Sequence, residues 1–146
     1  MTELTEKQQT WLEQLIFDGH VTAIIPILQD KVKLELVSID GETQLSIEGR
    51  MKDKDGTALE MLHTYAINTL GYTIKKIITD REVKAFANPD EAIAYIKTRP
   101  TAFIDAMIKA QSDFEKELKF IATGEAVENF TQPQGTVAAS GTTPKA

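Results

Sequence analysis

Residues 21–39 read VTAIIPILQDKVKLELVSI, and this stretch decides the fold of the chain. Its apolar residues are mostly β-branched and, from Val32 onward, they alternate with lysine and glutamate, which is the period of a half-buried strand. Gln29 and Asp30 interrupt the apolar run, so the pattern predicts a β-hairpin that turns at these residues. Pro26 has no N–H for a sheet ladder, which places the first strand at a sheet edge or makes it irregular.

The segment before the hairpin predicts an amphipathic helix. Thr5 and Gln8 have the spacing of a capping box, and Gly19 is a plausible stop. A helix of about three turns is marginal in water, so it needs a surface of its own domain or of a neighbour to pack on. Its apolar face would carry Trp11, Leu12, Leu15 and Ile16.

A hairpin alone is not stable, so helices must cover it. Residues 41–52 fit either a strand or a helix, and we favour a short helix because Asp40 and Glu42 suit a helix start. Asn88 and Pro89 predict the start of another helix, which runs to about Thr98. The last and longest helix is predicted from Thr101 to Gly124.

A further helix is predicted to begin after Thr57, which forms a capping box with Glu60. Its apolar stripe extends through Ile74, Ile77 and Ile78 if Gly71 is tolerated inside. A glycine within a helix costs about 1 kcal/mol relative to alanine, which one well-packed isoleucine could offset. We therefore expect this helix to continue to about Ile78. The helices are predicted to bury one set of side chains together, namely Leu62, Tyr65, Ile104, Ile108 and Leu118.

These elements predict an α+β fold that is mainly helical, with a β-hairpin near the N-terminus covered by about four to five helices. We divide the chain into an N-terminal amphipathic helix over residues 1–20 and a folded body over residues 21–127. Residues 128–146 are rich in Thr, Gln, Pro, Gly, Ala and Ser. Such a segment cannot bury enough apolar area to offset its ordering entropy, so we expect a flexible C-terminal tail.

Composition narrows the classes of partner. The formal net charge is −6 and the pI is about 4.9, so the overall field repels nucleic-acid phosphates and anionic lipid headgroups. The sequence has no cysteine, which excludes disulfides and cysteine zinc sites. No apolar run is long enough for a membrane span, and the N-terminus lacks the order of a secretion signal. We expect a soluble cytoplasmic protein that binds neither nucleic acid nor membranes.

The sequence offers no set of residues that we identify as catalytic, cofactor-binding or metal-ligating. His20 and His63 lack a histidine or cysteine partner at metal-ligand spacing. Phosphate-binding glycine loops and nucleophile elbows are also missing. We therefore expect a non-enzymatic protein that requires no cofactor. A small enzyme that uses carboxylates from distant segments remains an alternative, because such acid–base pairs leave no local signature.

Three residues are candidates for binding a partner protein. Trp11 lies on the short terminal helix, so it is either an anchor for a partner or part of the core. Asn129 and Phe130 lie in a polar segment, where one aromatic residue could dock into a pocket of another protein. Phe130 could equally fold back onto the core.

The order of these elements resembles that of the small tail assembly chaperones of bacteriophages and of related phage proteins that help to build the tail or baseplate. The resemblance covers residues 23–130 and is one of pattern. It follows the hairpin ILQDKVKLELVSI, the segment DGETQLSIEGRM, the helix ALEMLHTYAINTLGYTIKKI, the helix openings NPDEAIAYI and TAFIDAMI, and the loose C-terminus after ENF.

This resemblance implies a non-enzymatic protein that binds another phage structural protein, such as the tape measure or another tail protein, in the host cytoplasm. A permanent virion component, such as a neck, baseplate or head–tail connector protein, is the alternative within the same class. The family has no catalytic residues that could be transferred to this sequence. Whether the chain forms a homo-oligomer stays open.

Overall fold

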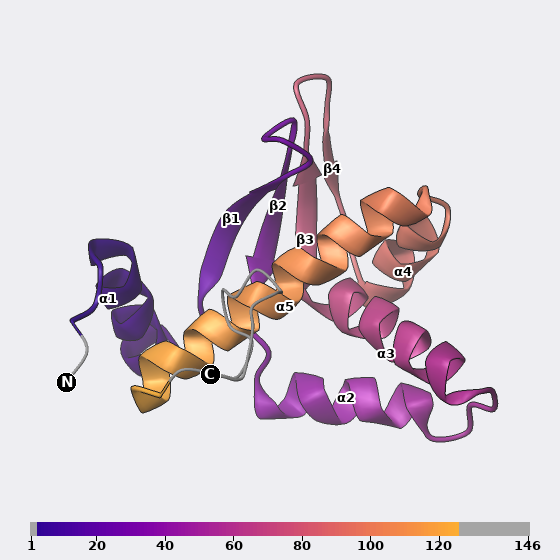
Figure 1. The fold of residues 1–146 in the computed structure, drawn as a ribbon, viewed down its shortest axis with the longest axis horizontal. Coiled ribbons are helices and arrows are strands. Elements are labelled where there is room, and N and C mark those ends of the chain that lie inside the picture. Colours follow the sequence, from indigo (N-terminus) through magenta and orange to yellow (C-terminus); the bar gives the residue numbers. More distant parts are fainter. Residues whose placement is uncertain (1–2, 126–146) are drawn as a thin grey trace, which may run out of the picture.

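The computed structural model describes residues 3–125. It confirms an α+β fold that is mainly helical, in which helices cover a sheet built around the predicted hairpin (Figure 1). The strands are β1 (Thr22–Ile27), β2 (Val32–Val37), β3 (Ile74–Ile78) and β4 (Val83–Ala85), and the helices are α1 (Glu6–Glu13), α2 (Gly41–Met51), α3 (Ala58–Thr73), α4 (Pro89–Lys97) and α5 (Thr101–Thr123). A single π-helical turn, η1 (Gln14–Asp18), extends α1 to Gly19.

The four strands form one antiparallel sheet in the order β1-β2-β3-β4. The hairpin forms as predicted, because the side chains of Val32, Leu34 and Leu36 are all buried on one face of β2. Pro26 of β1 lies opposite Lys33 of β2. Strand β1 is at the edge of the sheet, which is a position that tolerates proline. The turn uses positive φ at Leu28, Gln29 and Asp30, and the Lys31 N–H donates to the Leu28 carbonyl at 3.1 Å.

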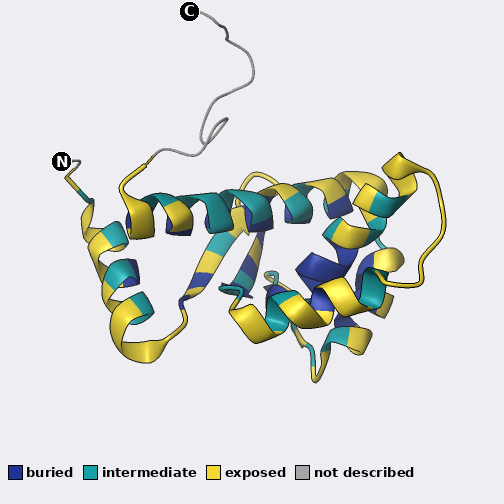
Figure 2. Ribbon diagram, turned by 90° about the horizontal axis from the view of Figure 1, so that it is seen from below, coloured by how far each residue is buried: buried dark blue, intermediate teal, exposed yellow. Residues whose placement is uncertain are grey.

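Helix α5 runs along the molecule and across one face of the sheet, where it contacts β1 (Figures 1 and 2). Its inward face carries Met107, Phe114 and Leu118, which join the strand residues in one core. Helices α3 and α4 pack on each other and add Leu70, Ile93 and Ile96 to the same core. The predicted helix starts are confirmed: Thr57 makes a capping box with Glu60, and Asn88 accepts from the Glu91 N–H at 2.8 Å.

The segment over residues 40–52 is the helix α2, as favoured from the sequence. The Asp40 side chain caps it by accepting a hydrogen bond from the Thr43 N–H at 2.7 Å. Only Ile47 of α2 is fully buried. This helix therefore lies at the margin of the core, connected to α3 by the polar loop that ends at Thr57.

The prediction that the helix after Thr57 continues to Ile78 is wrong. Helix α3 ends at Thr73, whose hydroxyl donates back to helix carbonyls, and the next residues form β3 against β2. Ile74 and Ile77 are three residues apart, so a regular strand would place them on opposite faces. A register irregularity at Glu35 and Leu36 lets both isoleucines be buried.

The predicted core is partly wrong. Ile104 and Leu118 are buried and Ile108 is partly buried, but the side chain of Leu62 is 67% exposed and Tyr65 is 36% exposed. The reason is the position of α3, which buries only its C-terminal half, from Ile67 onward. The N-terminal half extends past the sheet next to α2 (Figure 1).

Helix α1 packs on the C-terminal half of α5, so the chain itself supplies the surface that this short helix needs. The Trp11 ring meets the Phe114 ring edge-on, with centroids 5.1 Å apart. Lys7 and Gln8 both reach the Glu117 carboxylate. The capping box predicted at Thr5 and Gln8 is present. The predicted tail, residues 128–146, lies outside the described residues.

Candidate functional site

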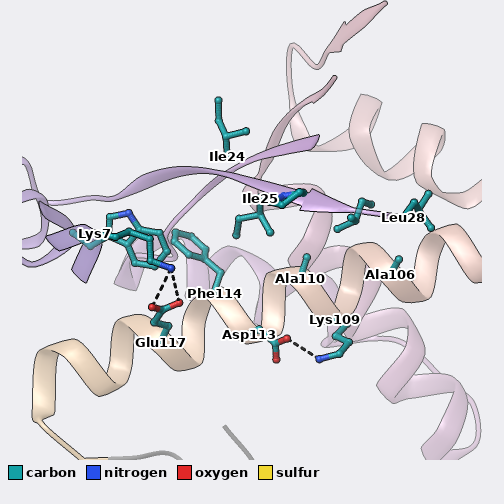
Figure 3. A pocket seen from close by; sticks show the side chains of 13 residues that line it. Lys7, Ile24, Ile25, Leu28, Ala106, Lys109, Ala110, Asp113, Phe114 and Glu117 are labelled. Atoms are coloured by element: carbon teal, nitrogen blue, oxygen red, sulfur yellow. Dashed lines mark hydrogen bonds and ion pairs between the residues drawn. The ribbon is translucent and has the colours of Figure 1, made fainter. Parts of the chain in front are cut away.

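A groove of about 550 Å³ lies between β1 and α5 (Figure 3). Its floor is apolar and is built from three segments that are distant in sequence. Trp11 comes from α1, Ile25 and Ile27 from β1, and Ala110 and Phe114 from α5. Residues of an edge strand therefore form one wall of an open apolar groove.

Charged side chains on α1 and α5 surround the groove. The Lys7 Nζ is 3.2 Å from the Glu117 Oε2 and lies 4.6 Å from the centre of the Trp11 ring. Lys109 pairs with Asp113 at 2.8 Å, one turn apart on α5 (Figure 3). The Lys109–Asp113 pair is exposed and such pairs contribute little to stability, so these two side chains can rearrange at low cost. An apolar floor with a polar rim is the usual anatomy of a protein-binding surface.

The outer edge of β1 carries unpaired backbone groups. The Ser38 N–H donates to the Val21 carbonyl at 2.8 Å, which fixes the phase of the ladder with β2. In that phase the backbone N–H and C=O groups of the odd-numbered residues of β1 point toward β2. The backbone groups of Thr22, Ile24 and Pro26 point away from the sheet. Pro26 therefore occupies a position that needs no N–H.

Little covers this edge within the described residues. The Gln14 side chain accepts weakly from the Thr22 N–H at 3.4 Å. Among residues 3–125, no acceptor reaches the Ile24 N–H. The Ile24 side chain is 56% exposed and points away from α5, whereas Ile25 points toward the groove (Figure 3). The edge and the groove together offer both backbone and side-chain contacts to an extended segment.

Of the three predicted site residues, only Trp11 lies within the described residues. Trp11 is only 8% exposed and belongs to the core, where it also forms part of the groove floor. Its role in binding a partner stays a prediction. Asn129 and Phe130 lie outside the described residues. Pro26 predicted that the first strand lies at a sheet edge or is irregular, and the structure places it at an edge. The groove beneath it was not predicted, because it depends on how α1 and α5 pack.

A second apolar surface lies on α2 and the N-terminal half of α3. The side chains of Leu45, Leu59 and Leu62 are 70%, 77% and 67% exposed. Leu59 and Leu62 are three residues apart and so share one side of α3. Gln44 of α2 donates to the Tyr65 hydroxyl at 2.9 Å, which joins the two helices at this end. Exposed leucines of this kind are typical of contact surfaces.

Glu115 is a partly buried carboxyl group whose pKa is raised. It lies on α5 and accepts a hydrogen bond from the Ile39 N–H at 3.0 Å, which joins the segment after β2 to this helix. Burial raises the pKa of this carboxyl above its ordinary value of 4.5, and the Ile39 N–H and Lys119 only partly oppose the effect. Its ionised form is therefore less favourable in the folded protein than in water.

We expect Glu115→Gln to be more stable than the parent near neutral pH, with a smaller difference in acid. The folded state holds the Glu115 proton more tightly than the unfolded state does. The free energy of unfolding of the parent therefore falls as the pH rises from about 4.5 through the folded-state pKa. Glutamine cannot ionise, and its oxygen can still accept from Ile39. Urea unfolding of both proteins over this pH range measures the difference, and a difference independent of pH would contradict the assignment.

Neither a metal cluster nor a membrane-spanning helix is found in the described part of the chain. No three His, Cys, Asp or Glu side chains of residues 3–125 gather closely enough to hold a metal ion. None of the helices described there is both long and apolar enough to cross a membrane. Comparison with known proteins finds no family model, curated protein or solved structure that matches the chain.

Proposed function

We propose that the chain is a non-enzymatic protein-binding protein that captures an extended segment of its partner by strand addition at β1. The observation that carries this proposal is the open edge of β1 directly beside the apolar groove. Backbone hydrogen bonds along the edge would hold the segment. The side chains of the segment, which would contact the groove, would provide specificity.

The geometry of strand addition defines the partner segment. A segment paired with Thr22, Ile24 and Pro26 would accept a hydrogen bond from the Ile24 N–H. Its own N–H groups could donate to the outward carbonyls of all three residues. Side chains alternate across a strand, so every second side chain of the segment would lie on the groove side, toward Trp11 and Phe114. The rim carries two lysines and two carboxylates. It therefore favours neither sign of charge, and the segment should be apolar at alternate positions.

The resemblance to phage tail assembly chaperones gives the proposal its finer form. In that form the chain is an assembly chaperone or adaptor in the host cytoplasm, and the partner is a tape measure or other tail protein. This step rests on the sequence pattern, whereas the binding mode rests on the β1 edge. A permanent virion component could use the same edge. Finding this protein in purified phage particles would favour the virion component. Its absence from them would favour the chaperone.

The replacement Ile24→Pro tests the binding mode. It removes the outward N–H while leaving the ladder to β2 intact, just as Pro26 does in the same phase. The partner is first identified by mass spectrometry of what co-purifies with the full chain in its native expression context. Its affinity is then measured by calorimetry with purified proteins. We expect Ile24→Pro to weaken binding at least about tenfold.

Two further variants complete the test. Ile24→Thr shortens the same exposed side chain but keeps the N–H, so it should bind within about threefold of the parent, a difference of less than 1 kcal/mol. Leu62→Ser disturbs the rival surface on α3 and should also bind normally. If Ile24→Pro stays folded by circular dichroism and binds like the parent, the β1 edge is not the site. If Leu62→Ser alone abolishes binding, the partner docks on α2 and α3 instead.

A further inference from the structure

Helix α5 ends close to the β1 groove, and the chain continues from that end. The groove runs from Lys7 and Glu117 at the α1 end to Leu28 and Ala106 at the other (Figure 3). Helix α5 continues about 10 Å beyond Glu117 to Gly124, which caps it in the left-handed conformation with a φ of 76°. Such a cap turns the chain away from the helix axis. The chain therefore leaves α5 at the α1 end of the groove.

The distance along the chain brings one aromatic residue to the middle of the groove. An extended chain advances about 3.3 Å per residue, so the stretch from Glu125 to Phe130 spans about 20 Å. The same 20 Å corresponds to about thirteen residues of helix, because a helix rises only about 1.5 Å per residue. A chain that turns back along α5 from Gly124 would therefore bring Phe130 level with Ala110 and Phe114, which line the groove.

The other features of this stretch also fit the groove. Among residues 126–134 only Glu128 is charged, which suits a rim that carries both signs of charge. Pro133 has no N–H for a ladder, so it would end the pairing just after the groove is filled. Val137, the next large apolar residue, would lie about 43 Å from Gly124, which is more than the length of α5. It is therefore too far along the chain to reach the groove in this way.

We propose that the C-terminal segment (residues 127–132) of the chain itself occupies the β1 groove, with Phe130 as its anchor, and that a partner must displace it. Strand β1 runs from the α1 end of the groove toward Leu28, so the returning segment lies parallel to it (Figure 3). In that position a segment carbonyl accepts the hydrogen bond that the outward Ile24 N–H offers. The short connection to α5 keeps the segment at a high effective concentration beside the groove.

The C-terminal segment is a weak match for the groove, which allows a partner to replace it. Side chains alternate along a strand, so Glu128, Phe130 and Gln132 would face the groove, and only Phe130 is apolar. A partner segment that is apolar at every second position buries more apolar surface there. This displacement step rests on the strand addition proposed above, whereas the docking of the C-terminal segment does not.

A spin label on the full chain tests the docking. The sequence has no cysteine, so a nitroxide attached to Gln134→Cys labels one position just beyond the C-terminal segment. We expect it to broaden the amide NMR signals of Leu28 and Ala106 in ¹⁵N-labelled protein. Phe130→Ala in the labelled chain should reduce this broadening at least about threefold, because it releases most of the docked population. Val137→Ala is the matched control and should leave the broadening unchanged.

Hydrogen exchange tests the backbone pairing without a label. The Ile24 amide should exchange at least about tenfold more slowly in the parent than in Phe130→Ala, because docking protects its outward N–H. Val137→Ala should exchange like the parent. Equal exchange of the Ile24 amide in the parent and in Phe130→Ala would show that the C-terminal segment does not pair with β1.

Partner binding tests the displacement. Phe130→Ala should raise the affinity for the purified partner at least about threefold, because the groove no longer has to be vacated. Val137→Ala should not change this affinity. Weaker binding by Phe130→Ala would overturn the displacement and would make Phe130 an anchor for the partner instead.

The same measurements identify other locations of the C-terminal segment, each of which would overturn the proposal. Broadening of the Leu59 and Leu62 signals in place of the groove signals would put the segment on α3. Broadening that requires mixing spin-labelled chains with separate ¹⁵N-labelled chains would assign it to the groove of a second copy. The spin-label and exchange experiments need no partner, so their outcome is independent of whether Ile24→Pro weakens partner binding.

Discussion

Phe114→Ala is expected to lower the free energy of unfolding by about 3–5 kcal/mol. Phe114 of α5 is 2% exposed, and its ring packs edge-on against Trp11 of α1, next to β1. Truncation removes this ring contact and leaves a cavity where α1, β1 and α5 meet. A domain of ordinary stability has only about 5–15 kcal/mol to lose. Urea unfolding followed by circular dichroism measures the change.

Leu62→Ala is the matched control, because it also truncates a large apolar side chain on a helix. Its side chain is 67% exposed, so the variant should stay within about 0.5 kcal/mol of the parent. The sequence has a single tryptophan, so the fluorescence of Trp11 reports specifically on its contact with Phe114. It should change in Phe114→Ala and stay unchanged in Leu62→Ala. Equal stability losses in the two variants would mean that the core is misplaced.

The elements that the sequence predicted correctly carry their signals locally. The hairpin follows from alternation around Val32 and from the break at Gln29 and Asp30. The helix starts at Thr57 and Asn88 follow from capping residues that act within one turn. In each case the residues that determine the structure lie within a few positions of it.

The failed predictions depend on contacts between distant segments. Ile74, Ile77 and Ile78 match the helical period, and only pairing with β2 through a bulge shows that they form a strand. Leu62 lies on an apolar stripe of α3, but the stripe does not reveal where the core ends along the helix. A pattern shows which side chains share a face and leaves open what covers that face.

The groove beside β1 could not be predicted from the sequence. The groove joins Lys7 to Glu117, which lie 110 residues apart. Pro26 was the one local sign of the β1 edge. It indicates a strand that is either at the edge or irregular, and it does not show that an apolar groove runs beside that strand.

Gly71→Ala is expected to destabilise the protein by about 1–3 kcal/mol, although alanine is the better helix former by about 1 kcal/mol. Gly71 is buried in α3 where α4 crosses it. A Cβ added there would lie 2.3 Å from the Ile93 Cγ1 and 3.1 Å from its Cδ1. The Cγ1 is held next to the backbone of α4, so the two helices would have to separate. Thermal and urea unfolding measure the loss.

Gly49→Ala isolates the contribution of helix propensity, because Gly49 lies inside α2 and an added Cβ there would meet nothing within 4 Å. This variant should gain about 0.5–1 kcal/mol. The contact itself is tested by combining Gly71→Ala with Ile93→Ala, which removes the atoms that clash. The double variant should lose less than the sum of the single losses, by about 0.5–3 kcal/mol. Strict additivity, or a Gly71→Ala variant that gains stability as Gly49→Ala does, would show that α3 and α4 do not approach this closely. The glycine that looked like an interruption of a helix in the sequence is therefore expected to set the distance between two helices.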